Sequence, residues 1–413
     1  MKTRERAVII FLGLALTLFL LVSQVRAPVS TATTLASDIL HLPLVYQPVP
    51  TPTPTVTPTP MPTPTPTRIA SKDFGYGIQA AMVADGDHER IFDHVNDMGL
   101  GWVKQQVEWF HYNPKQGVYE NWDALDRIVD AAKANDVNVL FSVVKAPAWA
   151  RADTDYGVAG PPADPNTYGT FLSDLATHYR GDVKAYEIWN EQNLWYEWGG
   201  EGEMDAGEYV DLLRVAYYAI KDADPEAIVV SGGLTPTGDV GDIAIADRRY
   251  LEQMYWAGLT HYCDAVGAHP SGYNNPPDAT YSGDPTTPNF KGHPSFFFRN
   301  TMEDYRNIMN RYGDGHKRIW PTEFGWASVD GLGVEPVQGY GYAEDNTEAE
   351  QAQYIVQAYE MGRSWDWLVG PMFLWNLNYA PVDGVHDEKA AFGIVYENWE
   401  PRPAFYAIRD MPK

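Results

Sequence analysis

The chain has 413 residues, a hydrophobic fraction of 45% and a formal net charge of −25 at pH 7. Such a negative field repels phosphate backbones and anionic lipids, so the composition argues against nucleic-acid partners and electrostatic membrane binding, whereas a neutral ligand is unaffected. The single cysteine, Cys263, excludes an intrachain disulfide and is expected to be a buried spectator thiol.

The N-terminal region predicts an export signal followed by a spacer. Basic residues precede an apolar run over 7–22, and Val25 and Ala27 have the −3 and −1 spacing that a signal peptidase accepts. Residues 1–27 are therefore expected to be a signal peptide, with an uncleaved membrane anchor as the alternative. Residues 28–70 are expected to be a linker, in which the Thr/Pro-rich segment 48–67 predicts an extended spacer of roughly 60 Å. This organisation predicts an extracellular or cell-surface tethered protein.

Residues 71–413 alternate short apolar runs with amphipathic helical patterns, which predicts one α/β domain with parallel strands. The expected strands are Tyr76–Ala80, Trp102–Gln106, Val139–Val144, Ala185–Trp189, Ile228–Ser231, Ala265–Ala268, Arg318–Thr322 and Pro371–Leu374. The expected helices are Asp123–Ala134, Asp205–Asp222, Arg248–Ala257, Phe296–Tyr312 and Glu348–Ser364.

Eight strands over this length predict a (β/α)8 TIM barrel, which typically takes about 250 residues and accepts long loops. A doubly wound open sheet is the alternative fold. That sheet would usually carry a glycine-rich phosphate loop, and the sequence contains neither G-x-G-x-x-G nor G-x-x-x-x-G-K-[ST].

Two glutamates follow predicted strands of this barrel. The stretch 185–191 reads as the fourth strand running into Asn190 and Glu191, and the stretch 318–326 reads as the seventh strand ending in Glu323. Active sites of such barrels lie at the C-terminal strand ends, so both side chains are expected at the barrel mouth. A pair of this kind suits glycosidic bond cleavage, in which one carboxyl protonates the leaving oxygen and the other attacks or activates water. Their repulsion is expected to raise the pKa of the acid. Two rim residues in ion pairs are the alternative.

The segments Trp189-Asn190-Glu191 and Thr322-Glu323-Phe324 resemble those of the clan A glycoside hydrolases, the "4/7" barrels. The flanking residues are most similar to family 39 and then to family 5-related barrels, over nearly the whole chain from about residue 74. This resemblance implies a retaining hydrolase of β-linked oligo- or polysaccharides, with Glu191 as acid/base and Glu323 as nucleophile. Their carboxyl groups would then lie about 5–5.5 Å apart. It also implies that Asn190 binds the sugar 2-hydroxyl.

Five further residues are expected to contact the substrate, each with structural packing as the alternative. His269 and Tyr273 follow the sixth strand and would reach the substrate or the nucleophile. Trp375 follows the eighth strand and would form the floor of the subsite that holds the cleaved sugar, because an apolar sugar face stacks on an aromatic ring. Trp326 is a candidate sugar platform after the seventh strand, and Lys104 is a candidate partner for substrate hydroxyls on the second strand.

Rival functions remain open at this stage. A non-catalytic carbohydrate-binding barrel on a stalk would need neither glutamate. A metal-dependent barrel hydrolase would usually show His-x-His on the first strand, and no two of the 10 histidines have that spacing. A serine hydrolase is disfavoured because G-x-S-x-G does not occur. Family 39 xylosidases carry an accessory β-sandwich for which this chain has little room, so endo action is as compatible as exo action. We expect a monomer without cofactor or metal.

Overall fold

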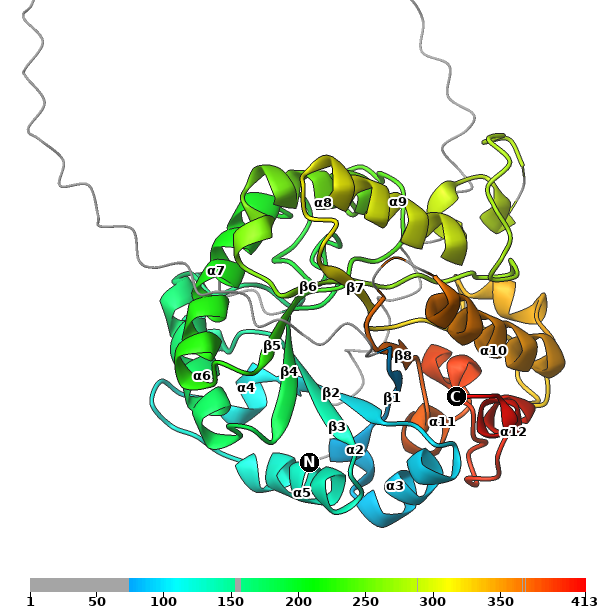
Figure 1. The fold of residues 1–413 in the computed structure, drawn as a ribbon, viewed down its shortest axis with the longest axis horizontal. Helices are drawn as coiled ribbons and strands as arrows, with labels where there is room; N and C mark the ends of the chain where they lie inside the picture. The colour runs from blue at the N-terminus through cyan, green and yellow to red at the C-terminus, as the bar shows by residue number, and fades with distance from the viewer. Residues whose placement is uncertain (1–73, 153–156, 288, 366, 368) are drawn as a thin grey trace, which may run out of the picture.

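The computed structural model describes residues 74–413, except 153–156, 288, 366 and 368 (Figure 1). The expected signal peptide and the linker lie outside the described residues. Among the described residues, no helix combines the length and the apolar character that crossing a bilayer requires.

Eight parallel strands form one sheet in the order β7-β6-β5-β4-β3-β2-β1-β8. Parallel bridges from Ile319 to Val369 and from Phe324 to Leu374 join the two ends of this sheet. The (β/α)8 barrel is therefore confirmed, and the open-sheet alternative is wrong. The strands are β1 (Tyr76–Gln79), β2 (Trp102–Glu108), β3 (Asn138–Val144), β4 (Val183–Ile188), β5 (Ile228–Ser231), β6 (Ala265–Ala268), β7 (Arg318–Pro321) and β8 (Met372–Leu374).

Helices surround the barrel and connect consecutive strands (Figure 1). The five expected helices are confirmed, with ends that differ by at most two residues. The structure adds α3, α6 and α12 among the longer helices. The longer helices are α3 (His88–Asp97), α5 (Trp122–Ala134), α6 (Pro165–His178), α7 (Ala206–Ala223), α8 (Asp247–Trp256), α9 (Phe298–Arg311), α10 (Glu348–Ser364) and α12 (Pro403–Asp410), and the short ones are α2 (Met82–Asp85), α4 (Trp109–Tyr112) and α11 (Tyr379–Asp383).

Side-chain caps mark the N-termini of four of the longer helices, α3, α6, α7 and α10. At α6, the Asp164 side chain accepts a hydrogen bond from the backbone N–H of Asn166, and Pro165 occupies the first turn. At α10, Thr347 and Glu350 form a reciprocal capping box. These local signals fix where α6 and α10 begin.

The barrel interior changes character along the strands. Its lower layer is a buried apolar cluster, and side chains two positions further along three strands are polar and fully buried, because alternate residues of a strand face the same side. The polar layer contains Lys104, Glu187 and Thr322. The apolar cluster comprises Leu140, Ala185, Val230, Ala265, Trp320 and Phe373. The polar side chains therefore gather toward the C-terminal strand ends, where barrels of this kind carry their sites.

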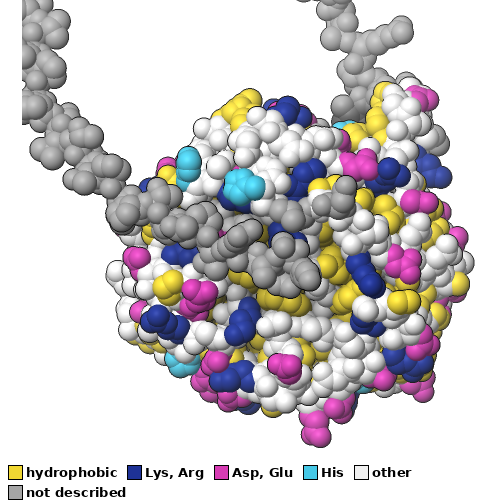
Figure 2. All heavy atoms as spheres, viewed as in Figure 1, with side chains coloured by type: hydrophobic (Ala, Val, Ile, Leu, Met, Phe, Trp, Pro, Cys, Tyr) yellow, Lys and Arg dark blue, Asp and Glu magenta, His cyan; other side chains and the backbone are white. Residues whose placement is uncertain are grey.

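Charges on the outside are mixed. Figure 2 shows Lys and Arg side chains interspersed with Asp and Glu over the face that it views.

Cys263 is buried, and burial raises the pKa of its thiol to about 12, which agrees with the expected spectator role.

Candidate active site

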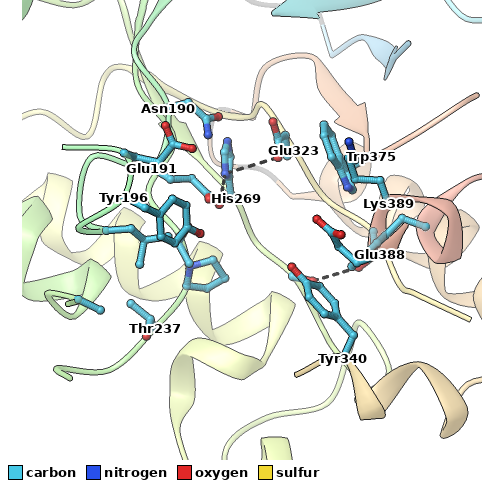
Figure 3. Close-up of a pocket in the computed structure, with 18 of the residues that line it drawn as sticks. Asn190, Glu191, Tyr196, Thr237, His269, Glu323, Tyr340, Trp375, Glu388 and Lys389 are labelled. Carbon is cyan, nitrogen blue, oxygen red and sulfur yellow. Dashed lines mark hydrogen bonds and ion pairs between the residues drawn. The ribbon is translucent and has the colours of Figure 1, made fainter. Parts of the chain in front are cut away.

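A cavity of about 620 Å³ opens at the C-terminal ends of the strands (Figure 3). Loops that follow β2 through β8 contribute to its lining. Six of the eight residues singled out in the sequence line this cavity, namely Asn190, Glu191, His269, Tyr273, Glu323 and Trp375. The sequence pattern therefore located the cavity, although it did not give every side chain its correct neighbours.

The two glutamates face each other across this cavity. One carboxylate oxygen of Glu191, one of Glu323 and a ring nitrogen of His269 all lie within 4.8 Å of one another. His269 Nδ1 lies 3.0 Å from Glu191 Oε1 and 3.8 Å from Glu323 Oε2. The prediction that the fourth and seventh strands bring these carboxylates together at the mouth is confirmed.

The turn after β4 holds Glu191 in an unusual backbone conformation. Trp189 and Glu191 have φ angles of 72° and 49°, a region that residues with a side chain rarely adopt. The Trp189 ring donates to the Glu197 carbonyl at 2.9 Å, and the Glu191 backbone N–H donates to the Gly233 carbonyl at 2.9 Å. These contacts fix the strained turn and aim the Glu191 side chain into the cavity.

The protonation of Glu191 differs from the sequence-based expectation. Burial raises the pKa of this carboxyl, but the hydrogen bond and charge of His269 outweigh burial, so the pKa lies below its ordinary value. The pKa of His269 is raised, because the attraction of Glu323 and Glu191 outweighs its own burial. The expectation of a raised pKa is therefore wrong for Glu191. Its nearest charged neighbour is the His269 ring, which donates a hydrogen bond, and not the second carboxylate. The lowered pKa of Glu191 and the raised pKa of His269 both favour the ion pair between a protonated His269 and an ionised Glu191.

Lys104 lies beneath the cavity instead of lining it, which corrects its expected role as a substrate contact. Its side chain is 1% exposed, and Nζ lies 2.9 Å from both Glu187 Oε2 and Glu323 Oε1. It also donates to the Thr322 carbonyl at 3.2 Å. Burial alone would lower the pKa of Lys104, but the two carboxylates raise it above the ordinary value, so the ammonium stays charged. The contact of Lys104 is with the candidate nucleophile, because its inward-facing position on β2 is one layer too deep to reach the cavity.

Glu187 is the second buried partner in this layer. Its carboxylate is fully buried in the barrel interior, and the attraction of Lys104 and His269 outweighs burial, so its pKa is lowered. Lys104 and Glu187 form a buried charged pair beneath Glu323, which we call the charged floor.

Trp326 is not a sugar platform. Its side chain is fully buried, it packs against Phe298 of α9 and Tyr354 of α10, and its ring donates to the Asn275 carbonyl at 2.8 Å. The loop after β7 turns this ring away from the mouth into the helix layer. Its expected role is therefore wrong, and the packing alternative holds.

Tyr273 lines the cavity, but its hydroxyl does not donate to Glu323. It donates to the Pro236 carbonyl at 3.1 Å, and the ring stacks on Phe290 with centroids 4.6 Å apart. The loop after β6 therefore uses Tyr273 to build the cavity wall.

Asn190 and Trp375 remain candidates for binding a sugar. Asn190 Oδ1 is a buried oxygen without a hydrogen-bond partner among the described residues, and the side chain lines the cavity beside Glu191. The Trp375 ring lies 5.0 Å from that of Tyr379, which also lines the cavity. An acceptor and an aromatic surface are thus available near the carboxylates.

Glu197 is a lining residue that the sequence reading missed. Burial raises its pKa to about 8, with Lys145 lowering it and Glu191 and Glu323 adding to the increase. Its Oε2 is buried without a hydrogen-bond partner among the described residues. The signal that could have found it is the aromatic-rich loop directly after Glu191, in which Glu197 is the one acidic residue between positions 192 and 200.

Comparison with known proteins places this geometry in a structural context. No family model matches the chain, and no curated protein matches it. Solved structures do match: a family 39 glycoside hydrolase from Bacteroides cellulosilyticus WH2 is 19% identical, with a TM-score of 0.63 over 82% of this chain and 63% of that one. The chain has the barrel fold of these clan A glycoside hydrolases.

Two further structures show the same fold. A family 39 enzyme from Xanthomonas axonopodis pv. citri is 16% identical, with a TM-score of 0.56 over 82% of this chain and 66% of that one. Xylanase 10B from Thermotoga maritima is 17% identical, with a TM-score of 0.53 over 82% of this chain and 94% of that one. The chain spans less than two thirds of the length of the two family 39 structures.

Proposed function

We propose that the protein is a retaining glycoside hydrolase that cleaves β-glycosidic bonds, with Glu191 as acid/base and Glu323 as nucleophile. The observation that carries the proposal is the approach of both carboxylates to within 4.8 Å around His269 at the mouth of the barrel. Retaining enzymes place these groups about 5–5.5 Å apart, whereas inverting enzymes need about 6.5–9.5 Å to admit a water molecule. The resemblance to clan A adds oligo- and polysaccharides as the expected substrate class.

The first step of the proposed reaction breaks the glycosidic bond. The His269–Glu191 pair supplies the proton, and Glu191 delivers it to the leaving oxygen. Lys104 engages Oε1 of Glu323 at 2.9 Å, which leaves Oε2 to attack the anomeric carbon. The bond between that carbon and the leaving oxygen breaks as the new ester bond to Glu323 forms.

The second step releases the sugar. Glu191, now deprotonated, accepts a proton from water as the water oxygen attacks the anomeric carbon, and the Glu323 carboxylate leaves. Two inversions give net retention. Asn190 is proposed to accept a hydrogen bond from the sugar 2-hydroxyl, and Trp375 to stack on its ring.

The test is a screen of aryl β-glycosides and β-linked polysaccharides with the wild-type protein and with Glu191→Ala and Glu323→Ala. Each substitution is expected to lower turnover by about a hundredfold or more, because acid–base assistance alone contributes that much. Glu397→Ala is the matched control, since Glu397 is an exposed carboxylate beyond β8. Oligosaccharide binding without hydrolysis would support the non-catalytic barrel, and full activity in either active-site variant would remove that residue from the mechanism.

We also propose that the protein is exported and acts outside the cell as a monomer. The proposal is supported by the basic and apolar residues before position 27 and by the Thr/Pro-rich linker. N-terminal sequencing of the protein from the culture medium tests it: cleavage after Ala27 is expected, and retention in the cytoplasm would contradict it.

A further inference from the structure

The cavity has two chemically different sides. The line from Glu191 to Glu323 joins the ends of β4 and β7, so the loops after β5 and β6 lie on one side and those after β8, β2 and β3 lie on the other. In Figure 3, Thr237 and Tyr340 lie on the same side of this line. We define the β5–β6 wall as the apolar lining residues from these two loops: Pro236, Val240, Ile243, Ala244, Phe290 and Phe296.

The two loops that form the β5–β6 wall offer few hydrogen bonds to a ligand. Besides His269, the loops after β5 and β6 contribute no charged side chain to the described lining. Three of their hydroxyl groups already donate to backbone carbonyls: Thr237 to Gly238 at 3.1 Å, Ser271 to Gly325 at 3.1 Å and Tyr273 to Pro236 at 3.1 Å. Thr235 Oγ1 is the one hydroxyl oxygen of these two loops that is buried without a hydrogen-bond partner among the described residues. The hydroxyls of a second sugar ring that face this wall would therefore find few partners, which is costly.

The opposite side has the composition that a sugar requires. Gln106 and Glu108 line it from the C-terminal end of β2, Lys145 lines it from the loop after β3, and Trp375 lines it after β8. The cleaved sugar therefore fits the polar side, with its anomeric carbon between the carboxylates. The leaving group then extends from Glu191 toward the β5–β6 wall, because the acid must reach the oxygen that this group carries.

We propose that this protein is specific for β-glycosides whose leaving group is an apolar alkyl or aryl alcohol, bound against the β5–β6 wall, instead of a second sugar. The inference rests on the proposed function, and it replaces oligo- and polysaccharides by alkyl and aryl β-glycosides as the substrate class. The aromatic corner of the wall is firmly packed, since the Phe290 ring lies 4.6 Å from Tyr273 and 5.1 Å from Phe296 between centroids. Val240 and Ile243 are half-buried on the facing loop. A flat or flexible apolar group fits between these two surfaces.

The test compares methyl, butyl and octyl β-D-glucosides and β-D-xylosides with cellobiose and xylobiose, below the micelle concentration. Each buried methylene is expected to lower KM by roughly up to fourfold, so octyl glycosides should have a KM at least tenfold below methyl glycosides. The disaccharides should have a higher KM than the octyl glycoside of the same sugar. The inference would be overturned if KM did not change with the length of the alkyl group, or if a disaccharide had a lower KM than the octyl glycoside of the same sugar.

Variants assign the effect to the wall. Ile243→Asn should reduce the octyl-to-methyl KM advantage at least fivefold, and Val240→Asn is the second variant in case the first does not fold. Trp256→Ser is the control, because this side chain is 70% exposed at the end of α8 and should leave the ratio unchanged. An unchanged ratio in both folded wall variants contradicts the proposal.

The two proposals fail in different ways. Cleavage that favours sugar leaving groups defeats the inference alone and leaves the hydrolase intact. Absence of any cleavage defeats the hydrolase, and calorimetric Kd values for methyl and octyl glycosides then still measure whether the wall binds the alkyl group at least tenfold more tightly.

Discussion

Replacing Lys104 with methionine tests the charged floor, which is the buried pair of Lys104 and Glu187 under the candidate nucleophile Glu323. The ammonium lies 2.9 Å from both Glu187 and Glu323, and at an effective dielectric constant of about 20 each contact is worth ~6 kcal/mol before dehydration is subtracted. Dehydration offsets most of that gain, but removing only the cation leaves two carboxylates without their partner. We therefore expect Lys104→Met to lower the free energy of unfolding by about 3–5 kcal/mol.

The assay is urea denaturation at pH 7, followed by circular dichroism. Lys133→Met is the matched control: its ammonium is also 2.9 Å from a carboxylate, that of Asp182, but the side chain is 52% exposed, so the loss should stay below about 1 kcal/mol. The double variant Lys104→Met/Glu187→Gln should be more stable than Lys104→Met, because one of the uncompensated charges is gone. A Lys104→Met loss as small as the control's, or a double variant that loses the sum of the two single effects, would refute the reasoning.

Three further predictions concern the cavity and its surroundings. The pKa of Glu197 near 8 lies above its ordinary 4.5, so the neutral form is stabilised in the folded protein, and the associated stability is present below pH 4.5 and lost as the pH rises to about 8. Glu197→Gln should therefore gain stability relative to wild type over that interval, by about 1.4 kcal/mol or less for each pH unit. The variant should also keep activity above pH 8, and identical pH profiles of the unfolding free energy for the two proteins would contradict this. His269→Asn removes the donor that lowers the pKa of Glu191, so that pKa should move to higher pH in an NMR titration of the carboxyl group; an unmoved pKa would count against the pair. Trp375→Ala should lower kcat/KM at least tenfold with little loss of stability. Trp326→Ala should instead lower the free energy of unfolding by about 3–5 kcal/mol, because Trp326 is fully buried. The reverse pattern in activity and denaturation assays would exchange their roles.

The sequence predicted the strands and the meeting of Glu191 with Glu323 because both follow from local rules. Eight apolar runs of parallel-strand character, spaced by helices, leave few folds, and the C-terminal ends of barrel strands converge on one mouth. Glu191 and Glu323 therefore had to meet once their strands were numbered correctly. Three longer helices were missed, although Pro165 after Asp164 is a start signal for one of them.

Side-chain environments were harder to predict, since they depend on depth and on loop paths. Strand parity faces Lys104 inward, but parity does not tell whether such a residue reaches the cavity or ends one layer below it. Trp326 lies three residues beyond Glu323, where the loop leaves the strand, and only packing against α9 and α10 decides its direction. The effect of His269 on the pKa of Glu191 likewise depends on a contact between residues 78 positions apart.

The most direct measurement of the central claim is covalent trapping. The protein is incubated with dinitrophenyl 2-deoxy-2-fluoro-β-glycosides, which form the glycosyl-enzyme faster than water releases it, and proteolytic peptides are analysed by mass spectrometry. Double displacement with the assigned roles predicts one fluoroglycosyl group on Glu323. A label on Glu191, or cleavage of the natural linkage without any labelled carboxylate, would contradict the account.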